Sequence, residues 1–306
     1  MIKRRDVLIG LAAACVVLGL PGIALAQASF SSTSLGGNLT LISGAGSNVV
    51  IAEGTDSVVV VNGGLQENAE ALLAEIQRLT NNKPISALFN TNWRPENCGL
   101  NYLLGPQGVP IIAHENSRLW QGADFYVEWQ DHMYQPMPAD TRANKTIYKT
   151  GTLSLGTEVI EYGFLGQTNT DGDIYVHFTQ ANVLVVGDMV GGEGYPMLDY
   201  VTGGWIGGAQ KATAGLIARA NVDTKVVASH GTVLALEHLQ AQAAMLDVAY
   251  NKVAEAFKTG RSLAQFQAAD PMMEFNPRWG DPQLFLTQLY NGTWYHVPGR
   301  AVPGII

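Results

Sequence analysis

Residues 38–65 read NLTLISGAGSNVVIAEGTDSVVVVNGGL. Three short runs of aliphatic and β-branched residues are separated there by Gly-Ala-Gly-Ser and Gly-Thr-Asp-Ser. Such runs between turn-forming residues are typical of strands. We therefore predict that the fold begins with a meander of three antiparallel strands.

Helix and strand patterns alternate after this meander. In residues 67–80, ENAEALLAEIQRLT, the apolar side chains recur at helical spacing. Residues 85–90, ISALFN, form an apolar run that predicts a strand, and this strand leads into a loop at residues 91–101, TNWRPENCGLN. The alternation is typical of an α/β fold.

The second half of the chain repeats the alternation. We expect strands over residues 157–165, 173–178, 182–188 and 224–229, which are apolar runs bounded by turn residues. Residues 203–220, GGWIGGAQKATAGLIARA, predict a helix. Two β-rich halves, each followed by helices, predict a four-layer αββα sandwich with the sheets inside and the helices outside.

The C-terminal part has a helical pattern from Leu234 onward. Residues 235–260 form a long amphipathic segment that ends at Gly260, a residue favoured at helix C-termini. The tail at residues 275–297 is rich in aromatic residues, so we expect it to pack against the core. We divide the chain into a main domain at residues 27–233 and a C-terminal helical extension at residues 234–306.

The first 26 residues have the features of a signal peptide. A basic start is followed by an apolar stretch and by Ala-Leu-Ala, a small-x-small cleavage site. Arg4 and Arg5 resemble a twin-arginine export signal. A membrane anchor is the alternative, but Pro21 and Gly22 interrupt the apolar run, and a lipoprotein signal at Cys15 fits less well. We predict a periplasmic or secreted protein without stable membrane insertion after signal removal.

The composition and net charge of the chain indicate which partners and which internal cross-links are not expected. The chain has 306 residues, 47% of them hydrophobic and 14% charged, and a formal net charge of -8. Removal of residues 1–26, whose net charge is +2, leaves -10, and such an acidic protein is not expected to bind nucleic acid. Cys98 is then the only cysteine, so no internal disulfide can form.

The ordered set of segments resembles the metallo-β-lactamase superfamily from the start of the mature chain to about Gly231. Besides the opening meander, the matching segments are VVVVNGG, the strand into TNWRPENCGLN, IIAHENSRLW, TDGDIYVHF, NVLVVGDMV and VVASHG. The resemblance implies that family's αββα sandwich. The C-terminal helices resemble extensions of some exported members.

The resemblance also implies where a metal site would lie. In the family, a His-x-His-x-Asp-His loop, a later His, an Asp that closes a strand and a final His hold one or two zinc ions, which activate water for hydrolysis. The seven corresponding residues here are Asn92, Arg94, Glu96, Asn97, Asn169, Asp188 and His230. Asp188 and His230 keep the family's ligand types, and Glu96 is a possible third ligand. We expect at most one divalent metal ion, which is zinc in the wider family.

Arg94 is the most informative of these changes. A guanidinium group keeps its proton and cannot ligate a metal. We hypothesise that Arg94 replaces the metal cation by holding Asp188 and Glu96 through hydrogen bonds. The alternative is that Arg94 points to solvent. Likewise, Asp188 could simply cap a turn at a strand end, and His230 could be a hydrogen-bonded structural histidine.

The asparagines suit a polar pocket better than a zinc site. Asn92, Asn97 and Asn169 can donate and accept hydrogen bonds, so they are candidates for substrate binding. Trp93 and Trp205 could wall this pocket, although both tryptophans could equally be core residues. Tyr195 is a further candidate for substrate binding, because the resemblance places it in a loop that the family uses near its active site.

Two functions from different classes follow. One is an exported hydrolase of a small ester, lactone or amide with a mononuclear or metal-free site, in which His230 or Asp188 serves as a general base. The other is a binding protein for a small molecule that has lost catalysis. β-Lactam hydrolysis is not expected, because most ligands that would activate water are missing.

Overall fold

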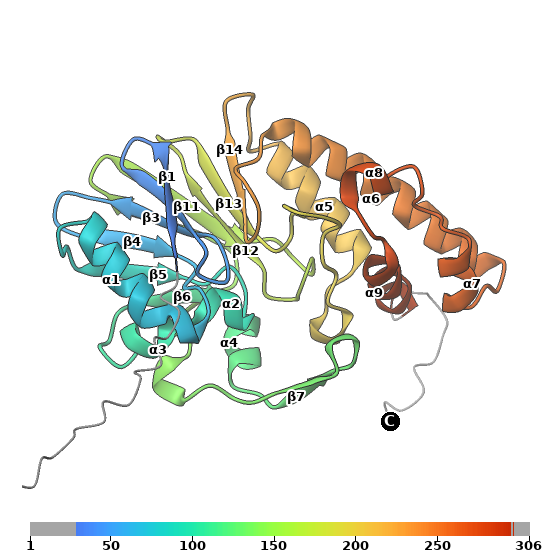
Figure 1. Ribbon diagram of the computed structural model, residues 1–306, viewed down its shortest axis with the longest axis horizontal. Coiled ribbons are helices and arrows are strands. Elements are labelled where there is room, and N and C mark those ends of the chain that lie inside the picture. Colours follow the sequence, from blue (N-terminus) through green and yellow to red (C-terminus); the bar gives the residue numbers. More distant parts are fainter. Residues whose placement is uncertain (1–28, 295, 297–306) are drawn as a thin grey trace, which may run out of the picture.

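A computed structural model describes residues 29–294 and 296, so the predicted signal peptide lies outside the described residues. Seven strands form the first sheet, in the order β1-β2-β3-β4-β5-β6-β9 (Figure 1). They are β1 (Ser31–Gly36), β2 (Leu39–Ser43), β3 (Val49–Glu53), β4 (Val58–Val61), β5 (Ile85–Phe89), β6 (Ile111–His114) and β9 (Lys145–Ile147). β1 to β4 are antiparallel neighbours, and β4 to β9 pair in parallel. The predicted meander is therefore confirmed as β2, β3 and β4.

Five strands form the second sheet. In sheet order they are β10 (Thr150–Leu155), β11 (Glu158–Phe164), β12 (Ile174–Phe178), β13 (Val183–Gly187) and β14 (Lys225–Ala228). β13 and β14 pair in parallel, and α5 (Ile206–Ile217) connects them. The four strands predicted in this half correspond to β11 to β14.

The central strands are buried on both faces, which accounts for the layered arrangement of sheets and helices. In β4, Val59 and Val61 pack into the core between the sheets, whereas Val58 and Val60 pack against α1 (Ala69–Leu79). Side chains alternate across a strand, so a strand covered on both faces is apolar throughout. β13 follows the same rule, because its residues alternate between the inter-sheet core and the core under α5. Helices, two sheets and helices again make the predicted αββα sandwich.

The C-terminal extension is helical, as expected. It consists of α6 (Leu236–Lys258), α7 (Leu263–Ala268), α8 (Asn276–Trp279) and α9 (Gln283–Trp294), which lie on the α5 side of the molecule (Figure 1). Met245, Trp279 and Phe285 belong to a separate apolar core that these helices share with α5. The aromatic tail is therefore packed as far as it is described. No helix in the described ranges has both the length and the hydropathy to cross a bilayer.

The remaining elements lie in the connections. The helices α2 (Pro95–Cys98), α3 (Asn101–Leu104) and α4 (Glu115–Gln121) follow β5 and β6, and a hairpin of β7 (Phe125–Val127) and β8 (His132–Tyr134) follows α4. α5 begins at Ile206 rather than at residue 203, because Trp205 is in an extended conformation with φ of -159°. The polar, largely exposed edge strand β1 was not predicted, since its residues lack an apolar pattern.

Candidate functional site

The predicted site residues lie at the ends of three strands. The loop at residues 91–97 follows β5, Asp188 follows β13, and His230 lies two residues after β14. The strand ends approach closely, because a Cβ atom on Gly187 would lie 2.6 Å from Oγ1 of Thr91. Gly187 also has a φ of +62°, so glycine is favoured there on both grounds.

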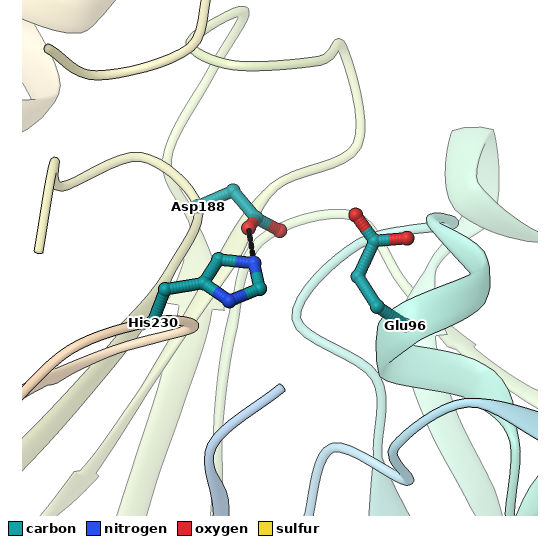
Figure 2. Close-up of side chains that lie close together, drawn as sticks. All are labelled: Glu96, Asp188 and His230. Carbon is teal, nitrogen blue, oxygen red and sulfur yellow. Dashed lines mark ion pairs between the residues drawn. The ribbon is translucent and has the colours of Figure 1, made fainter. Parts of the chain in front are cut away.

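Two amide groups hold Asp188. Its Oδ2 atom accepts hydrogen bonds from Nδ2 of Asn92 and from Nδ2 of Asn97, each at 2.8 Å. Its Oδ1 atom faces Nε2 of His230 at 3.8 Å (Figure 2). Asn92 and Asn97 are fully buried and Asp188 is 7% exposed, so these bonds form away from water. One oxygen of Asp188 is thus occupied by protein donors, and the other faces the open side of the site.

The asparagine network extends to a carboxyl group that sequence reasoning missed. Nδ2 of Asn92 also donates to Oδ1 of Asp173 at 3.1 Å, and Oδ1 of Asn92 accepts from Nδ2 of Asn97 at 2.8 Å. Oδ2 of Asp173 accepts from Oγ1 of Thr168 and the backbone N–H of Thr170, both at 2.5 Å. Burial of Asp173 raises the pKa of its carboxyl group to about 7, although these donors oppose the shift.

Arg94 is a buried cation, so it does not point to solvent. Its side chain is 3% exposed, and its Nε donates to Oε1 of Glu96 at 2.8 Å. Its Nη1 lies 3.7 Å from Oδ2 of Asp199. The guanidinium carbon also lies 5.7 Å and 5.6 Å from the ring centroids of Trp93 and Trp129. Burial lowers the pKa of Arg94, but the carboxylates around it outweigh this effect and keep the pKa above its ordinary value.

These contacts correct the predicted partners of Arg94. Glu96 is a partner, as expected, but the second direct partner is Asp199 instead of Asp188. Asp199 is fully buried, and Trp129 Nε1 and Thr202 Oγ1 donate to it at 3.0 and 2.9 Å. Asp188 makes no direct contact with the guanidinium, because the two asparagine amides bond its buried oxygen, but its charge still contributes to the raised pKa of Arg94. Arg94 therefore neutralises one side of the site, and the amides hold the other.

Glu96, Asp188 and His230 form the candidate metal centre. One ligand atom of each residue lies within 4.8 Å of the corresponding atoms of the other two. Figure 2 shows the Glu96 carboxylate facing Asp188 and His230 from the opposite side of the gap. Two carboxylates and an imidazole are suitable ligands for a single divalent ion, and coordination would require only a modest contraction. These three residues fit one metal ion.

The family's other ligand positions, which hold Asn92, Arg94 and Asn169 in this chain, do not fit a metal ion. Arg94 cannot ligate, and the amides of Asn92 point toward carboxylates. Asn169 is fully buried, and neither side-chain atom of Asn169 has a hydrogen-bond partner among the described residues. Nη1 of Arg94 likewise lacks a hydrogen bond within that part of the chain. A second metal ion has no ligand set here.

The aromatic candidates have mainly packing roles. Trp93 is 4% exposed, donates to Thr202 Oγ1 at 3.2 Å and packs edge-on against Phe125 and Tyr134. Trp205 packs against the C-terminal core. Tyr195 is anchored by a 2.8 Å hydrogen bond from its hydroxyl to Oδ1 of Asn276. Of the three, Tyr195 borders the groove that also contains Asp188 and His230.

Two grooves reach the candidate centre. The larger, of about 750 Å³, lies between the first-sheet loop at residues 43–48 and the loop at residues 229–233. The smaller, of about 250 Å³, lies between Asp188, His230 and the loop at residues 190–197. Both grooves border Glu193, Ser229 and His230. His230, whose side chain is 47% exposed, is therefore accessible from solvent.

Comparisons with known proteins agree with this architecture. Residues 42–230 match the protein family described as the metallo-beta-lactamase superfamily. A metallo-beta-lactamase from Pontibacter korlensis is similar in structure, with a TM-score of 0.58 and 19% identity over 72% of this chain and 99% of that chain. The DIM-1 metallo-beta-lactamase gives a TM-score of 0.57 and 17% identity over 72% of this chain and 98% of that one.

A larger protein is also similar. The inverting sec-alkylsulfatase Pisa1 from Pseudomonas sp. gives a TM-score of 0.63 and 14% identity, over 79% of this chain and 45% of that protein. At these identities the structural matches bear on the fold alone. A comparison with curated proteins gives no match.

Proposed function

This chain belongs to the metallo-beta-lactamase superfamily, and from that membership we propose that it is an exported hydrolase that acts on a small ester, lactone or amide at a single-metal centre. The observation that carries the proposal is the convergence of Glu96, Asp188 and His230, whose ligand atoms lie within 4.8 Å of one another. A bound divalent ion such as zinc would supply Lewis-acid activation of water near neutral pH.

The protein groups around this centre are already oriented. The amides of Asn92 and Asn97 fix Oδ2 of Asp188, which leaves Oδ1 directed toward His230. Arg94 fixes Oε1 of Glu96, and the other carboxylate oxygen has no protein donor among the described residues. This preorganisation lowers the entropy cost of assembling the ligands. The grooves beside His230 give a substrate access to the same point.

A metal-free binding protein is the second candidate. The network of Asn92, Asn97, Asp188 and Arg94 supports it, because buried polar groups satisfy most of one another's hydrogen bonds without an ion. In this reading, the site is neutralised by Arg94, and His230 or Asp188 contacts a small ligand. Catalysis would be absent or would depend on His230 as a general base.

Metal content and turnover in the same preparation distinguish the two candidates. We expect about one zinc or other divalent ion per chain after dialysis, together with hydrolysis of chromogenic esters or lactones. Both should be lost in Glu96→Gln and His230→Ala, and retained in the distant surface variant Glu255→Gln. Metal-free protein that binds no added ion and hydrolyses nothing would favour the binding protein. β-Lactams are expected to be poor substrates, because the second metal half-site is missing.

Export is a separate part of the proposal. Arg4 and Arg5 precede the apolar run in the pattern of a twin-arginine signal. Replacement of both by lysine should leave the precursor in the cytoplasm of a bacterial host, whereas the unmodified chain should reach the periplasm and lose its first residues. Cell fractionation with N-terminal sequencing measures both outcomes.

A further inference from the structure

Glu193 occupies a distinctive position in the grooves. It is an exposed residue of the glycine-rich loop after Asp188, and it borders both grooves at the point where they meet beside His230. Its Cγ atom would lie 2.9 Å from a Cβ atom on Gly231, so the side chain leans over the loop that carries His230. The Glu193 side chain thus lies over Gly231, next in sequence to His230 of the candidate metal centre.

The loop that carries Glu193 is firmly supported. Gln242 of α6 accepts from the backbone N–H of Gly191 at 3.0 Å and donates to the carbonyl oxygen of Met189 at 3.1 Å. The Tyr195 ring stacks on Phe285 of α9 with centroids 4.8 Å apart. A Cβ atom on Gly192 would lie 1.9 Å from the carbonyl oxygen of His230, so the two loops are in close contact. The C-terminal extension therefore supports the backbone of the loop that carries Glu193.

The carboxylate of Glu193 is unpaired within the part of the chain that the structure describes. Within residues 29–294 and 296, no side chain forms an ion pair or hydrogen bond with its carboxylate. In the same part of the chain, neither groove is lined by a lysine or an arginine. Arg94, the cation nearest to the centre, is buried and paired with Glu96 and Asp199. The grooves thus contain unpaired negative charge without a matching positive charge.

Apart from Glu193 and His230, the large groove is lined by uncharged residues, both polar and apolar. Its lining is rich in hydroxyl and amide side chains, namely Ser31, Thr33, Ser43, Ser47, Asn48, Ser229 and Thr232. Asp188 adds a second acidic group at the border of the smaller groove. Beside Glu193, an anionic group of a substrate would be repelled and a cationic group attracted, whereas a divalent ion bound at the candidate centre would offset the charges of Asp188 and Glu96. The charge of Glu193 therefore favours cationic over anionic substrates in these grooves.

We propose that Glu193 is a specificity-determining residue that binds an ammonium group of the substrate, so that the preferred substrates are cationic esters or amides. The proposal rests on the proposed hydrolase function and adds the class of substrate to it. The ammonium group pairs with Glu193 at the junction of the grooves, while the ester or amide carbonyl reaches the centre at Asp188 and His230. The hydroxyl-lined groove accommodates the remainder of the substrate.

Three acetate esters of similar size but different charge test this specificity. They are acetylcholine, its neutral carbon analogue 3,3-dimethylbutyl acetate, and the anionic 4-acetoxybutanoate, each followed by proton release in a pH-stat. We expect kcat/KM to decrease in that order. In Glu193→Gln, the ratio of kcat/KM for acetylcholine to that for the neutral ester should fall about fivefold, as expected for a partly exposed ion pair.

Charge reversal and a control variant complete the kinetic test. Glu193→Lys should shift the preference toward 4-acetoxybutanoate, because the new cation would attract its carboxylate. Glu255→Gln, which removes an exposed charge on α6 outside both grooves, should leave the ratio unchanged. A ratio that Glu193→Gln does not alter would overturn the assignment of Glu193.

Binding of choline separates this proposal from the hydrolase function. Ligand-observed NMR with choline should detect saturable binding to the wild-type protein and weaker binding to Glu193→Gln. Choline binding that depends on Glu193 without any ester hydrolysis would support cation recognition and overturn the hydrolase. Hydrolysis without a charge preference and without choline binding would support the hydrolase and overturn the cationic substrate class.

Discussion

The two halves of the candidate site differ in how their polar groups are satisfied. In the half formed by Asn92, Arg94 and Asn169, every side chain is at most 3% exposed. In the half formed by Glu96, Asp188 and His230, the side chains of Glu96 and His230 are 18% and 47% exposed. In the first half, Asn92 and Arg94 bond to carboxylates of the protein, and the buried Asn169 has no hydrogen-bond partner among the described residues. The second half presents carboxylate and imidazole atoms to a gap.

This difference shows how a buried metal site can change when its metal ligands are replaced. A buried site without its ion must satisfy its polar groups by other means, because an unpaired buried charge is very unfavourable. Here Arg94 provides the positive charge, and the amides of Asn92 and Asn97 provide the donors. A partly exposed half has no such requirement, since water can solvate its carboxylate and imidazole. Substitutions in the first half should therefore affect stability most, and those in the second should affect metal binding most.

The largest effect on stability is expected from Arg94→Met. This change keeps the length of the side chain but leaves Glu96 and the fully buried Asp199 without a cation. Loss of one partner from a buried pair costs about 3 to 5 kcal/mol, so we expect a decrease of that size in the free energy of unfolding. Urea denaturation at pH 7 after dialysis against a chelator measures it.

Arg118→Met is the matched control for this prediction. Arg118 also pairs with a glutamate, Glu115, but its side chain is 38% exposed. Its removal should cost less than about 1 kcal/mol, as for other surface pairs. Equal losses in the two variants would show that the buried position of Arg94 has no special role, and the contrast between the two halves would fail.

Replacement of Asp188, which belongs to the second half and accepts a hydrogen bond from Asn92 of the first, should have the next largest effect. Asp188→Ala removes the acceptor of the Asn92 and Asn97 amides, and unsatisfied buried donors cost about 1 to 3 kcal/mol. Asp188→Asn retains an oxygen that can accept from both amides but is a poorer metal ligand. We therefore expect both variants to lose metal, while only Asp188→Ala loses much stability. Metal analysis and urea denaturation of the two variants test this, and equal stability losses would contradict it.

The sequence predicted the fold better than the contacts within the site. The runs at residues 58–61 and 183–187 are apolar on both faces, so their burial between layers follows from composition alone. The resemblance to the superfamily implied that Glu96, Asp188 and His230 lie together, and their ligand atoms do lie within 4.8 Å of one another. The edge strand β1 and the hairpin of β7 and β8 lack such patterns and were missed.

Asp173 and Asp199 show why the sequence did not predict every carboxylate of the site. Asp173 lies in a Thr-Asp-Gly-Asp stretch that has the composition of an ordinary turn, and Asp199 follows a glycine-rich loop. Their burial beside Asn92 and Arg94 arises from tertiary packing of segments far apart in the chain. No local spacing encodes that proximity, so the sequence suggested Asp188 as a partner of Arg94 where the fold supplies Asp199.

The pH dependence of stability should also depend on the buried half of the site. Burial raises the pKa of Asp173 from 3.8 to about 7. Between these values the unfolded chain has released this proton and the folded chain retains it, so the contribution of Asp173 to stability falls as pH rises from about 4 to 7. The slope is at most about 1.4 kcal/mol per pH unit.

Asp173→Asn should remove this contribution. Urea denaturation of the wild type and the variant at pH 4.5, 5.5 and 6.5 measures the difference in slope, and other titrating groups affect both proteins alike. The variant is expected to be less stable at low pH, because its amide nitrogen would face the donors of Asn92, Thr168 or Thr170. Parallel pH profiles for the two proteins would show that Asp173 is ionised in the folded state across this range.

The smallest effect on stability is expected from His230→Ala. The imidazole of His230 is 47% exposed, and its contact with Oδ1 of Asp188 is 3.8 Å long, so the variant should lose less than about 0.5 kcal/mol in the absence of metal. With zinc added, however, the wild type should gain stability that the variant does not, because only a folded protein with all three ligands binds the ion tightly. Melting temperatures with and without zinc measure this difference. A zinc-dependent gain of equal size in both proteins would mean that the ion binds elsewhere. The half formed by Glu96, Asp188 and His230 would then not be the metal centre.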